Sequence, residues 1–251
     1  MASLRALITG GSVGIGAAIA DAIVAEGGTV AILDVRPPDR EQDRHYVPCD
    51  VRDEQAVVEA VQVAVAQMGG INHAYVNAGI GSLVPLLDMT AAMWDDVHAV
   101  NLRGAFLTLR ECAKSMLETE GGGSIVLTGS ISGFLADRCM AHYCSSKAGL
   151  VSLCKVAAAE LGPRNVRVNL IAPGLTDSPL FATTDENLPG YRDAMGHHTP
   201  LGRIGACSDV ARAAIGLAGM EWVTGQVLVA DGGVALHSPI DVIDFLPAKP
   251  K

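Results

Sequence analysis

Two residues that could carry out acid–base chemistry, Tyr143 and Lys147, lie four positions apart where a helix is predicted to begin. Residues at this spacing share one face of a helix, so we expect the phenol and the ammonium to be neighbours. A phenol with its ordinary pKa of about 10 is a poor base at neutral pH. An ammonium about 4 Å away favours the phenolate by roughly 4 kcal/mol, before desolvation, at an effective dielectric constant of about 20. The pair therefore predicts general acid–base chemistry at Tyr143.

Ser130 lies thirteen residues before Tyr143, just past the end of a predicted strand. A hydroxyl at this place is suited to hold a substrate oxygen while the phenol exchanges its proton. Taken alone, each signal is modest. A tyrosine and a lysine at this spacing are common on helix surfaces, and Ser130 stands among ordinary turn formers such as Gly129 and Gly133.

A glycine-rich turn follows the first predicted strand, between Thr9 and a helix expected at 14–26. Glycines let the backbone turn sharply and approach a pyrophosphate closely, and the free N–H groups of the next helix point toward that anion. The spacing is G-x-x-x-G-x-G rather than the commoner G-x-G-x-x-G, and a purely structural turn is the alternative. We predict a dinucleotide phosphate site formed by Gly10, Ser12, Val13, Gly14, Ile15 and Gly16.

Asp34 ends the second predicted strand, twenty positions after Gly14. An acidic side chain at this position accepts hydrogen bonds from the adenosine ribose and repels a 2′-phosphate. Asp34 therefore favours NAD over NADP as the cofactor. Two alternatives remain open. The aspartate can simply begin the following turn, and Arg36 is close enough to accommodate the 2′-phosphate of NADP.

Apolar strands alternate with helices along the whole chain. This pattern is typical of a parallel sheet covered by helices on both faces, so we predict one α/β domain over residues 1–251 with a doubly wound sheet. The substrate pocket is then expected outside the carboxyl ends of the strands. The predicted strands are 4–9, 29–33, 45–49, 72–76, 124–128, 166–171 and 226–229, and the predicted helices are 14–26, 53–68, 90–98, 100–118, 141–161 and 208–218.

Acidic residues outnumber basic ones, 27 to 18, which gives a net charge of −9. With no basic block in the chain, we expect neither nucleic-acid binding nor attachment to an anionic membrane. The sequence contains no apolar run of about 18 residues, so we expect no membrane-spanning helix. The six cysteines form no C-x-x-C pair and show no zinc-type spacing. We therefore expect reduced thiols, a cytoplasmic location and no metal site, with His197 and His198 as exposed loop residues.

Taken together, these features resemble the short-chain dehydrogenase/reductase family. The resemblance covers nearly the whole chain, from Leu4 to about Gly233, and its specificity comes from the order of the motifs rather than from any one of them. It rests on Thr9-Gly10-x-x-x-Gly14-Ile15-Gly16, Asp50-Val51, Asn77-Ala78-Gly79, Asn101, Ser130, Tyr143-x-x-x-Lys147, Pro173-Gly174 and Asp231-Gly232-Gly233.

The resemblance implies a Rossmann fold and a role for each residue of the catalytic group. Tyr143 is implied as the general acid–base and Ser130 as the hydroxyl that orients the substrate. Lys147 is implied to lower the pKa of Tyr143 and to bind the nicotinamide ribose. Asn101 is implied to hold a water that links Lys147 to solvent, although a polar residue at a helix start is the simpler interpretation.

The resemblance also implies the remaining cofactor contacts. Asp50 and Val51 correspond to adenine contacts, with Asp50 accepting from the exocyclic amine, and Asn77-Ala78-Gly79 to a turn whose small residues let the cofactor pass. Plain strand-end turns are the alternative for both. The sequence departs from the family in two places: at positions 176 and 178, where an aliphatic residue and a threonine are usual, and in a tail of eighteen residues after Gly233. The contacts expected at the first of these places are Pro173, Gly174, Thr176 and Ser178, the last still offering a hydroxyl.

An irregular but apolar stretch, about 175–205, is predicted to form a substrate loop, and an apolar tail covers about 234–251. The tail is expected to fold over a neighbouring subunit or over its own. No arginine or lysine is an obvious partner for a substrate carboxylate, although Arg138 and Arg192 could reach one. The pocket is expected to be mostly apolar and to be lined by Ile80, Leu83, Ile131, Phe134, Cys139, Met140, Leu180, Phe181 and Met195.

The helix over 148–161 is apolar nearly all round and needs cover on more than its sheet face. A second subunit could supply it, and the resemblance implies a homotetramer, with a dimer or cover by the chain itself as alternatives. The predicted function is an NAD-dependent secondary alcohol dehydrogenase or ketone reductase for a small molecule. A 3-oxoacyl thioester reductase of fatty-acid type is the second enzyme hypothesis, and an NAD-binding regulator or scaffold without turnover is the third.

Overall fold

The structure is a computed structural model that describes residues 4–39, 44–118, 121–182 and 188–236. Within these residues a seven-stranded parallel sheet runs in the order β3-β2-β1-β4-β5-β6-β9. The chain forms a single domain with a Rossmann-type fold, so the prediction of a doubly wound α/β sheet is confirmed. The strands are β1 (Arg5–Thr9), β2 (Thr29–Asp34), β3 (Arg44–Pro48), β4 (His73–Val76), β5 (Gly123–Thr128), β6 (Val166–Pro173) and β9 (Val227–Ala230).

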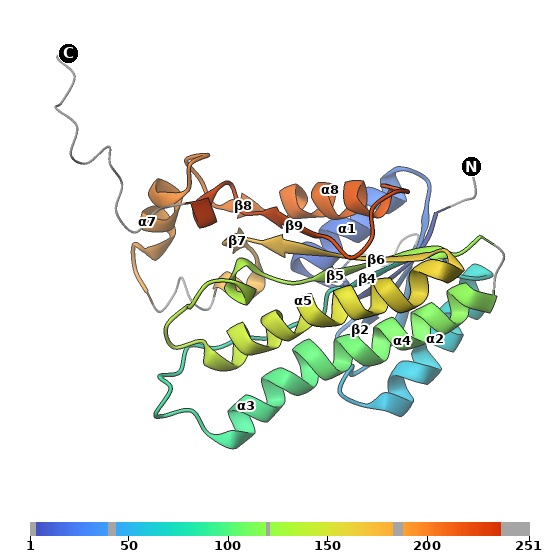
Figure 1. Ribbon diagram of the computed structural model, residues 1–251, viewed down its shortest axis with the longest axis horizontal. Helices are drawn as coiled ribbons and strands as arrows, with labels where there is room; N and C mark the ends of the chain where they lie inside the picture. Colours follow the sequence, from blue (N-terminus) through green and yellow to red (C-terminus); the bar gives the residue numbers. More distant parts are fainter. Residues whose placement is uncertain (1–3, 40–43, 119–120, 183–187, 237–251) are drawn as a thin grey trace, which may run out of the picture.

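Helices cover both faces of the sheet (Figure 1). On one face α2 (Glu54–Met68), α4 (Ala105–Glu118) and α5 (Ala141–Leu161) enclose the larger apolar core. On the other face α1 (Gly14–Ala25) and α8 (Cys207–Ala218) enclose a second core. Because both faces are covered, the strands are almost continuously apolar, and this is the pattern that made them recognisable in the sequence.

Local signals explain where most of these elements begin and end. The Asp53 side chain accepts hydrogen bonds from the N–H groups of Gln55 and Ala56 and so begins α2, and left-handed Gly69 ends it. The helix α1 differs, because its N-cap residue, Val13, makes no side-chain hydrogen bond. The first-turn N–H groups of α1 are therefore left for a ligand.

The helices expected at 90–98 and 100–118 form one longer run. It consists of α3 (Ala91–His98), a π-helical turn η1 (Ala99–Gly104) and α4. The prediction of two separate helices, with Asn101 at the start of the second, is wrong. Asn101 is buried inside the π-helical turn, where its side chain bonds to a distant loop. Such turns occur often at functional sites.

The irregular stretch after β6 has some regular structure of its own. It contains β7 (Thr176–Asp177), which pairs with β8 (Gly205–Ala206), and the short helix α7 (Tyr191–His198). His197 and His198 therefore lie in a helix rather than in a loop. The greater part of the apolar tail, residues 237–251, lies outside the described residues. No helix in the described part of the chain is long and apolar enough to cross a membrane.

Candidate active site

The catalytic group predicted from the sequence is brought together just beyond the carboxyl end of β5. Ser130 follows that strand and caps the short helix η2 (Ile131–Gly133), its Oγ accepting the N–H of Ser132 at 3.1 Å. Tyr143 lies in the first turn of α5, and a hydrogen bond with Ser130 lowers the pKa of its phenol. The serine and the phenol are thus neighbours, as a shared substrate oxygen requires.

Lys147 lies one turn further along α5, and its Nζ is 5.5 Å from the centre of the Tyr143 ring. The Lys147 side chain is buried, and Nζ donates to the carbonyl oxygen of Thr128 at 2.9 Å. Burial lowers the pKa of Lys147 to about 8, because a low-dielectric environment disfavours the ammonium. The predicted proximity of phenol and ammonium therefore holds in the structure.

The electrostatic balance at Tyr143 differs from the expectation. Burial, the largest influence, raises the pKa of Tyr143 to about 12, and the hydrogen bond with Ser130 offsets only part of that rise. Lys147 is not among the groups that lower this pKa in the chain alone. Burial of both groups disfavours their charged forms, and the spacing of the two residues in the sequence does not reveal how large that cost is. A poised phenolate therefore needs a further positive charge at the site.

Asn101 connects the catalytic helix to the loop after β4. Its Oδ1 accepts the N–H of Ile80 at 2.8 Å, and its Nδ2 donates to the Ile80 carbonyl at 2.9 Å and to Ser146 Oγ at 3.1 Å. Both polar atoms of the side chain are thus engaged by protein groups. The proposed water relay through Asn101 stays a prediction.

The glycine-rich turn lies at the carboxyl end of β1, and its geometry admits little but glycine. Gly10 has a φ of +63° and Gly14 one of +62°, a region that side chains disfavour. A Cβ on Gly16 would lie 2.2 Å from the Gly10 carbonyl oxygen. Together with the uncapped N-terminus of α1, this close-packed backbone fits a dinucleotide phosphate. Ser12, Val13 and Ile15 are carried by the same turn and the start of α1.

Asp34 is buried at the carboxyl end of β2, beside this turn. One carboxylate oxygen accepts the N–H of Ser12 and the other the N–H of Arg36, each at 3.1 Å. The Ser12 hydroxyl in turn donates to the Arg36 carbonyl at 2.6 Å. Backbone hydrogen bonds therefore hold the Asp34 carboxylate where a ribose is expected, while Arg36 is exposed.

The Asn77-Ala78-Gly79 turn joins the glycine-rich turn to the catalytic lysine. Asn77 Nδ2 donates to the Gly10 carbonyl at 3.1 Å, and its Oδ1 accepts from the Thr128 hydroxyl at 3.1 Å. The Thr128 carbonyl is the one that holds Lys147. A Cβ on Gly79 would lie 3.5 Å from Lys147 Nζ, so this turn passes directly beside the catalytic group.

Two supporting hydroxyls were missed in the sequence. Thr9 Oγ1 accepts the N–H groups of both Asn77 and Ala78, at 3.0 and 3.2 Å, and Thr128 supplies the contacts described above. Both threonines end strands that precede a motif, and a threonine last in a buried strand is the signal that could have revealed them.

The predicted adenine contacts lie at the β3–α2 connection. Val51 is buried, and its side chain fills the space above Gly104, where a Cβ would approach to 2.8 Å. Asp50 is bound by Arg52 at 2.7 Å, and Arg52 also binds Asp96 at 2.7 Å. The Asp50 carboxylate is thus already paired, so its predicted bond to the adenine amine would be shared with Arg52.

The chain after β6 turns back over the glycine-rich turn. A Cβ on Gly14 would lie 3.7 Å from Ser178 Cβ, which brings these two predicted cofactor contacts together. The Thr176 hydroxyl donates to the Gly174 carbonyl at 3.0 Å and so stabilises the bend after Pro173. Thr176 therefore has a structural partner, whereas the predicted contact of Ser178 with a phosphate stays a prediction.

The substrate loop is tied to the end of the sheet at both of its roots. The Gly174 N–H donates to the Ala230 carbonyl at 3.1 Å, and the Leu201 N–H donates to the Gly232 carbonyl at 3.2 Å. Within the loop, Arg192 binds Asp177 at 2.9 Å and lies over the ring of Phe181. Four of the expected pocket-lining side chains are exposed and Phe181 is buried; the exposed four are Leu83, Phe134, Cys139 and Leu180.

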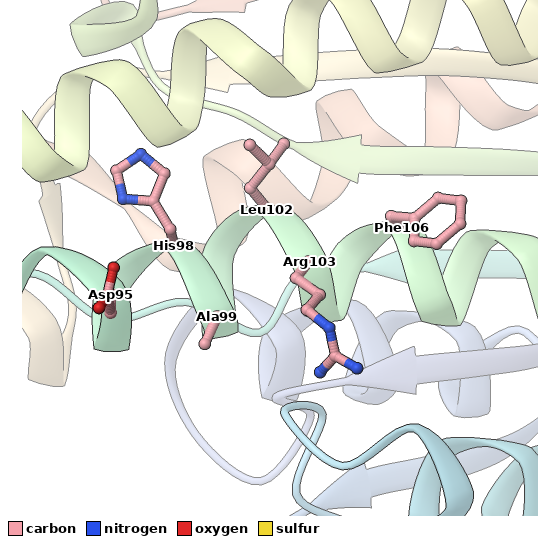
Figure 2. A pocket seen from close by; sticks show the side chains of 6 residues that line it. All are labelled: Asp95, His98, Ala99, Leu102, Arg103 and Phe106. Atoms are coloured by element: carbon pink, nitrogen blue, oxygen red, sulfur yellow. The ribbon is translucent and has the colours of Figure 1, made fainter.

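A separate surface pocket of about 450 Å³ lies along the run from α3 to α4 (Figure 2). Its lining includes none of the predicted catalytic or cofactor residues, and Leu102 points toward α5, where it contacts Gly149. We assign this pocket no part in the chemistry. It is lined by Asp95, His98, Ala99, Leu102, Arg103 and Phe106.

Comparisons with known proteins agree with this geometry. Residues 10–235 match the family model described as Enoyl-(Acyl carrier protein) reductase. D-threitol dehydrogenase of Mycolicibacterium smegmatis is 36% identical over 92% of this chain and 92% of its own length.

Two solved structures show the same fold. Aldohexose dehydrogenase of Thermoplasma acidophilum matches with a TM-score of 0.90 and 29% identity, covering 95% of this chain and 97% of that one. A short-chain type dehydrogenase/reductase from Mycobacterium marinum matches with a TM-score of 0.87 and 32% identity, covering 93% and 96%. Sequence, motif geometry and fold thus agree: the chain belongs to the short-chain dehydrogenase/reductase family of nicotinamide-dependent oxidoreductases.

Proposed function

We propose that the protein is an NAD-dependent oxidoreductase that interconverts a secondary alcohol and a ketone on a small, mostly apolar molecule. The observation that carries the proposal is the placing of Ser130, Tyr143 and Lys147 around one point beside the glycine-rich turn. A bound nicotinamide dinucleotide supplies or accepts the hydride. Ser130 orients the substrate oxygen, and Tyr143 gives that oxygen a proton or takes one from it.

Lys147 supports this role of Tyr143 by keeping positive charge next to the phenol. Because burial alone raises the pKa of Tyr143, the charge of the oxidised nicotinamide is the additional influence that the site requires. We propose Gly10, Ser12, Val13, Gly14, Ile15, Gly16 and Ser178 as the phosphate site. Asp50, Val51, Asn77, Ala78, Gly79, Pro173, Gly174 and Thr176 are proposed to line the rest of the cofactor site.

Asp34 supports NAD as the cofactor. Its buried carboxylate, held by two backbone N–H groups, meets the ribose with a fixed negative charge and repels a 2′-phosphate. The description of the matching family model favours a reductase of carrier-bound acyl groups as the second candidate. Turnover with NADPH rather than NADH on a 3-oxoacyl thioester would select that candidate.

The exposed apolar side chains at the mouth of the site support an apolar substrate, although the similar proteins named above act on a tetritol and on aldohexoses. We propose a homotetramer, or a dimer, because Val156 on the apolar helix α5 is 52% exposed in the single chain. All six cysteines are free thiols, which supports a cytoplasmic location.

A screen of secondary alcohols with NAD, and of ketones with NADH, tests the proposal by absorbance at the reduced nicotinamide band. The active pair is then repeated with Tyr143→Phe. Loss of turnover is expected. Turnover near wild type would reject the mechanism, and no turnover on any substrate by a chain that binds NAD would favour the regulator or scaffold hypothesis.

A further inference from the structure

A buried histidine stands immediately before the catalytic tyrosine, and the proposed chemistry does not use it. His142 is fully buried. Its Nδ1 accepts the N–H of Tyr143 at 2.8 Å, and its Nε2 lies 3.0 Å from Ser82 Oγ. Since Nδ1 is an acceptor in the first bond, a neutral imidazole carries its proton on Nε2 and donates it to Ser82. One side chain therefore joins the start of α5 to the loop after β4.

That loop forms a wall against the phenol ring of Tyr143. A Cβ on Gly81 would lie 3.1 Å from Tyr143 Cδ2, so the loop backbone and the ring are in close contact. On one side of Gly81, both backbone groups of Ile80 are bonded to Asn101. On the other side, Ser82 is bonded to His142. Residues Ile80, Gly81 and Ser82, which form this wall, are thus held at both ends. Of the two side chains that hold them, Asn101 and His142, only Asn101 belongs to the family motif.

The neutral state of His142 suits this arrangement. Burial, the largest influence, lowers the pKa of His142 and nearby His98 lowers it further, whereas a hydrogen bond to the Met140 backbone raises it. A protonated imidazole would have no acceptor at Nδ1, and the Tyr143 N–H would lose its partner. Because the side chain is held by one acceptor bond and one donor bond, the two contacts can be removed separately by substitution.

We propose that His142 is a positioning residue, which acts through Ser82 to hold the wall against Tyr143 and so keeps the phenol in place for proton transfer. This inference rests on the proposed function, since it concerns the residue that transfers the proton. Small displacements of a reacting group reduce the rate of the chemical step far more than they weaken cofactor binding. The expected signature is therefore a lower kcat with little change in the KM for NAD.

The two hydrogen bonds are tested with amides of different length. The short amide of His142→Asn can accept the Tyr143 N–H but does not reach Ser82, whereas the longer amide of His142→Gln can donate to Ser82. We expect Ser82→Ala and His142→Asn each to lower kcat roughly ten-fold, the loss of about one hydrogen bond, and His142→Gln to retain most of it. Combining Ser82→Ala with His142→Asn is expected to lower kcat no further.

The second serine–histidine pair on α5 provides a matched control. Ser145 Oγ lies 3.1 Å from His98 Nε2 and is bonded to the backbone carbonyls of Ala141 and His142. Because none of these bonds involves Ser82 or the His142 ring, Ser145→Ala should leave kcat unchanged. Wild-type kcat in Ser82→Ala, or multiplied losses in the double variant, would overturn the proposal. Because Ser82 is exposed, its substitution tests the idea even where a histidine variant does not fold.

A readout that needs no turnover separates this inference from the proposed function. Nitrogen NMR of ¹⁵N-histidine-labelled protein, with His142→Gln used to assign the signal, reports which ring nitrogen carries the proton. We expect the Nε2–H form, and a change in its signal in Ser82→Ala. A His142 signal that is unchanged in Ser82→Ala would reject the positioning role while leaving the oxidoreductase proposal intact. If Tyr143→Phe retained turnover with the expected NMR result, the chemical assignment would fail instead, and His142 would be only a structural link.

Discussion

The two sides of the crevice are held in different ways. On the cofactor side, backbone hydrogen bonds fix the polar groups: Asp34 accepts two N–H groups, Thr9 accepts two more, and Asn77 links the glycine-rich turn to Thr128. On the substrate side, Leu83 and Phe134 project from loops and are about half exposed. The residues on the cofactor side lie at strand ends, whereas those on the substrate side lie in the segments between helices and strands.

This difference separates in space the residues proposed to bind the cofactor from those proposed to select the substrate. A side chain fixed by the sheet meets the same cofactor in the same way, whereas a loop can change its side chains without disturbing the sheet. The similar proteins act, by their names, on D-threitol and on aldohexoses. Tyr143 stands at the boundary, with a partner on each side.

The largest expected effect is at this boundary. Tyr143→Phe removes the proton-transfer group, and we expect kcat to fall roughly 10²- to 10⁴-fold, the usual contribution of general acid–base catalysis. Tyr75→Phe is the matched control, because the buried Tyr75 hydroxyl has no hydrogen-bond partner among the described residues. Its kcat should match wild type. Equal losses in both variants would show that the measurement reports folding rather than proton transfer.

The next effect concerns the buried ammonium and is measured as stability against pH. The pKa of Lys147 is about 8 in the folded chain and has its usual value of 10.5 when unfolded. Between these values the unfolded chain holds a proton that the folded chain lacks, so this group makes stability rise with pH, by at most on the order of 3 kcal/mol. Below pH 8 the full cost of burying the charge is present.

Denaturant unfolding of wild type and Lys147→Met, from pH 7 to 10, isolates that contribution as the difference between the two curves. The difference should change steadily above pH 8. A constant difference would mean that the Lys147 ammonium is as accessible to solvent as a loop side chain. That result would contradict the contrast between the firmly held side of the crevice and the exposed side.

A smaller effect is expected for cofactor choice. Asp34→Ala removes the charge that repels a 2′-phosphate and a hydrogen-bond acceptor for the ribose, so the preference for NADH over NADPH should fall roughly 10- to 100-fold in kcat/KM. Asp39→Ala removes an equal charge from an exposed site on the same connection and should leave the ratio nearly unchanged. If both variants shift the ratio alike, net charge rather than the fixed carboxylate sets the preference.

The smallest expected effect is tested with two glycines that have similar, positive φ values. Gly14 and Gly27 have φ values of +62° and +79°, so an alanine at either site should cost roughly 1 kcal/mol of folding stability. Only Gly14→Ala should also weaken NAD binding, because only Gly14 lies at the phosphate turn. Calorimetric titration with NAD measures this, and equal affinities in the two variants would argue against a phosphate site at Gly14.

Much of the fold and site could be predicted because it rests on local or periodic signals. The predicted strand at 45–49 lies one residue from the observed Arg44–Pro48, and the helix 141–161 has the predicted bounds. The π-helical turn was missed because its cause is tertiary: Asn101 bonds to Ile80, twenty-one positions away. The raised pKa of Tyr143 was missed because burial, which no spacing reveals, outweighs the hydrogen bond with Ser130.

Both roots of the substrate loop are fixed to neighbouring points at the end of β9, one to its last residue, Ala230, and the other to Gly232 just beyond it. The loop therefore leaves and re-enters the domain at almost one place. Insertions or replacement of the residues between Ser178 and Leu201 would leave the strand order and the proposed cofactor contacts Thr176 and Ser178 undisturbed. The range of substrates can thus change through exchange of this one loop. Transfer of the loop between relatives is a practical route for redesign.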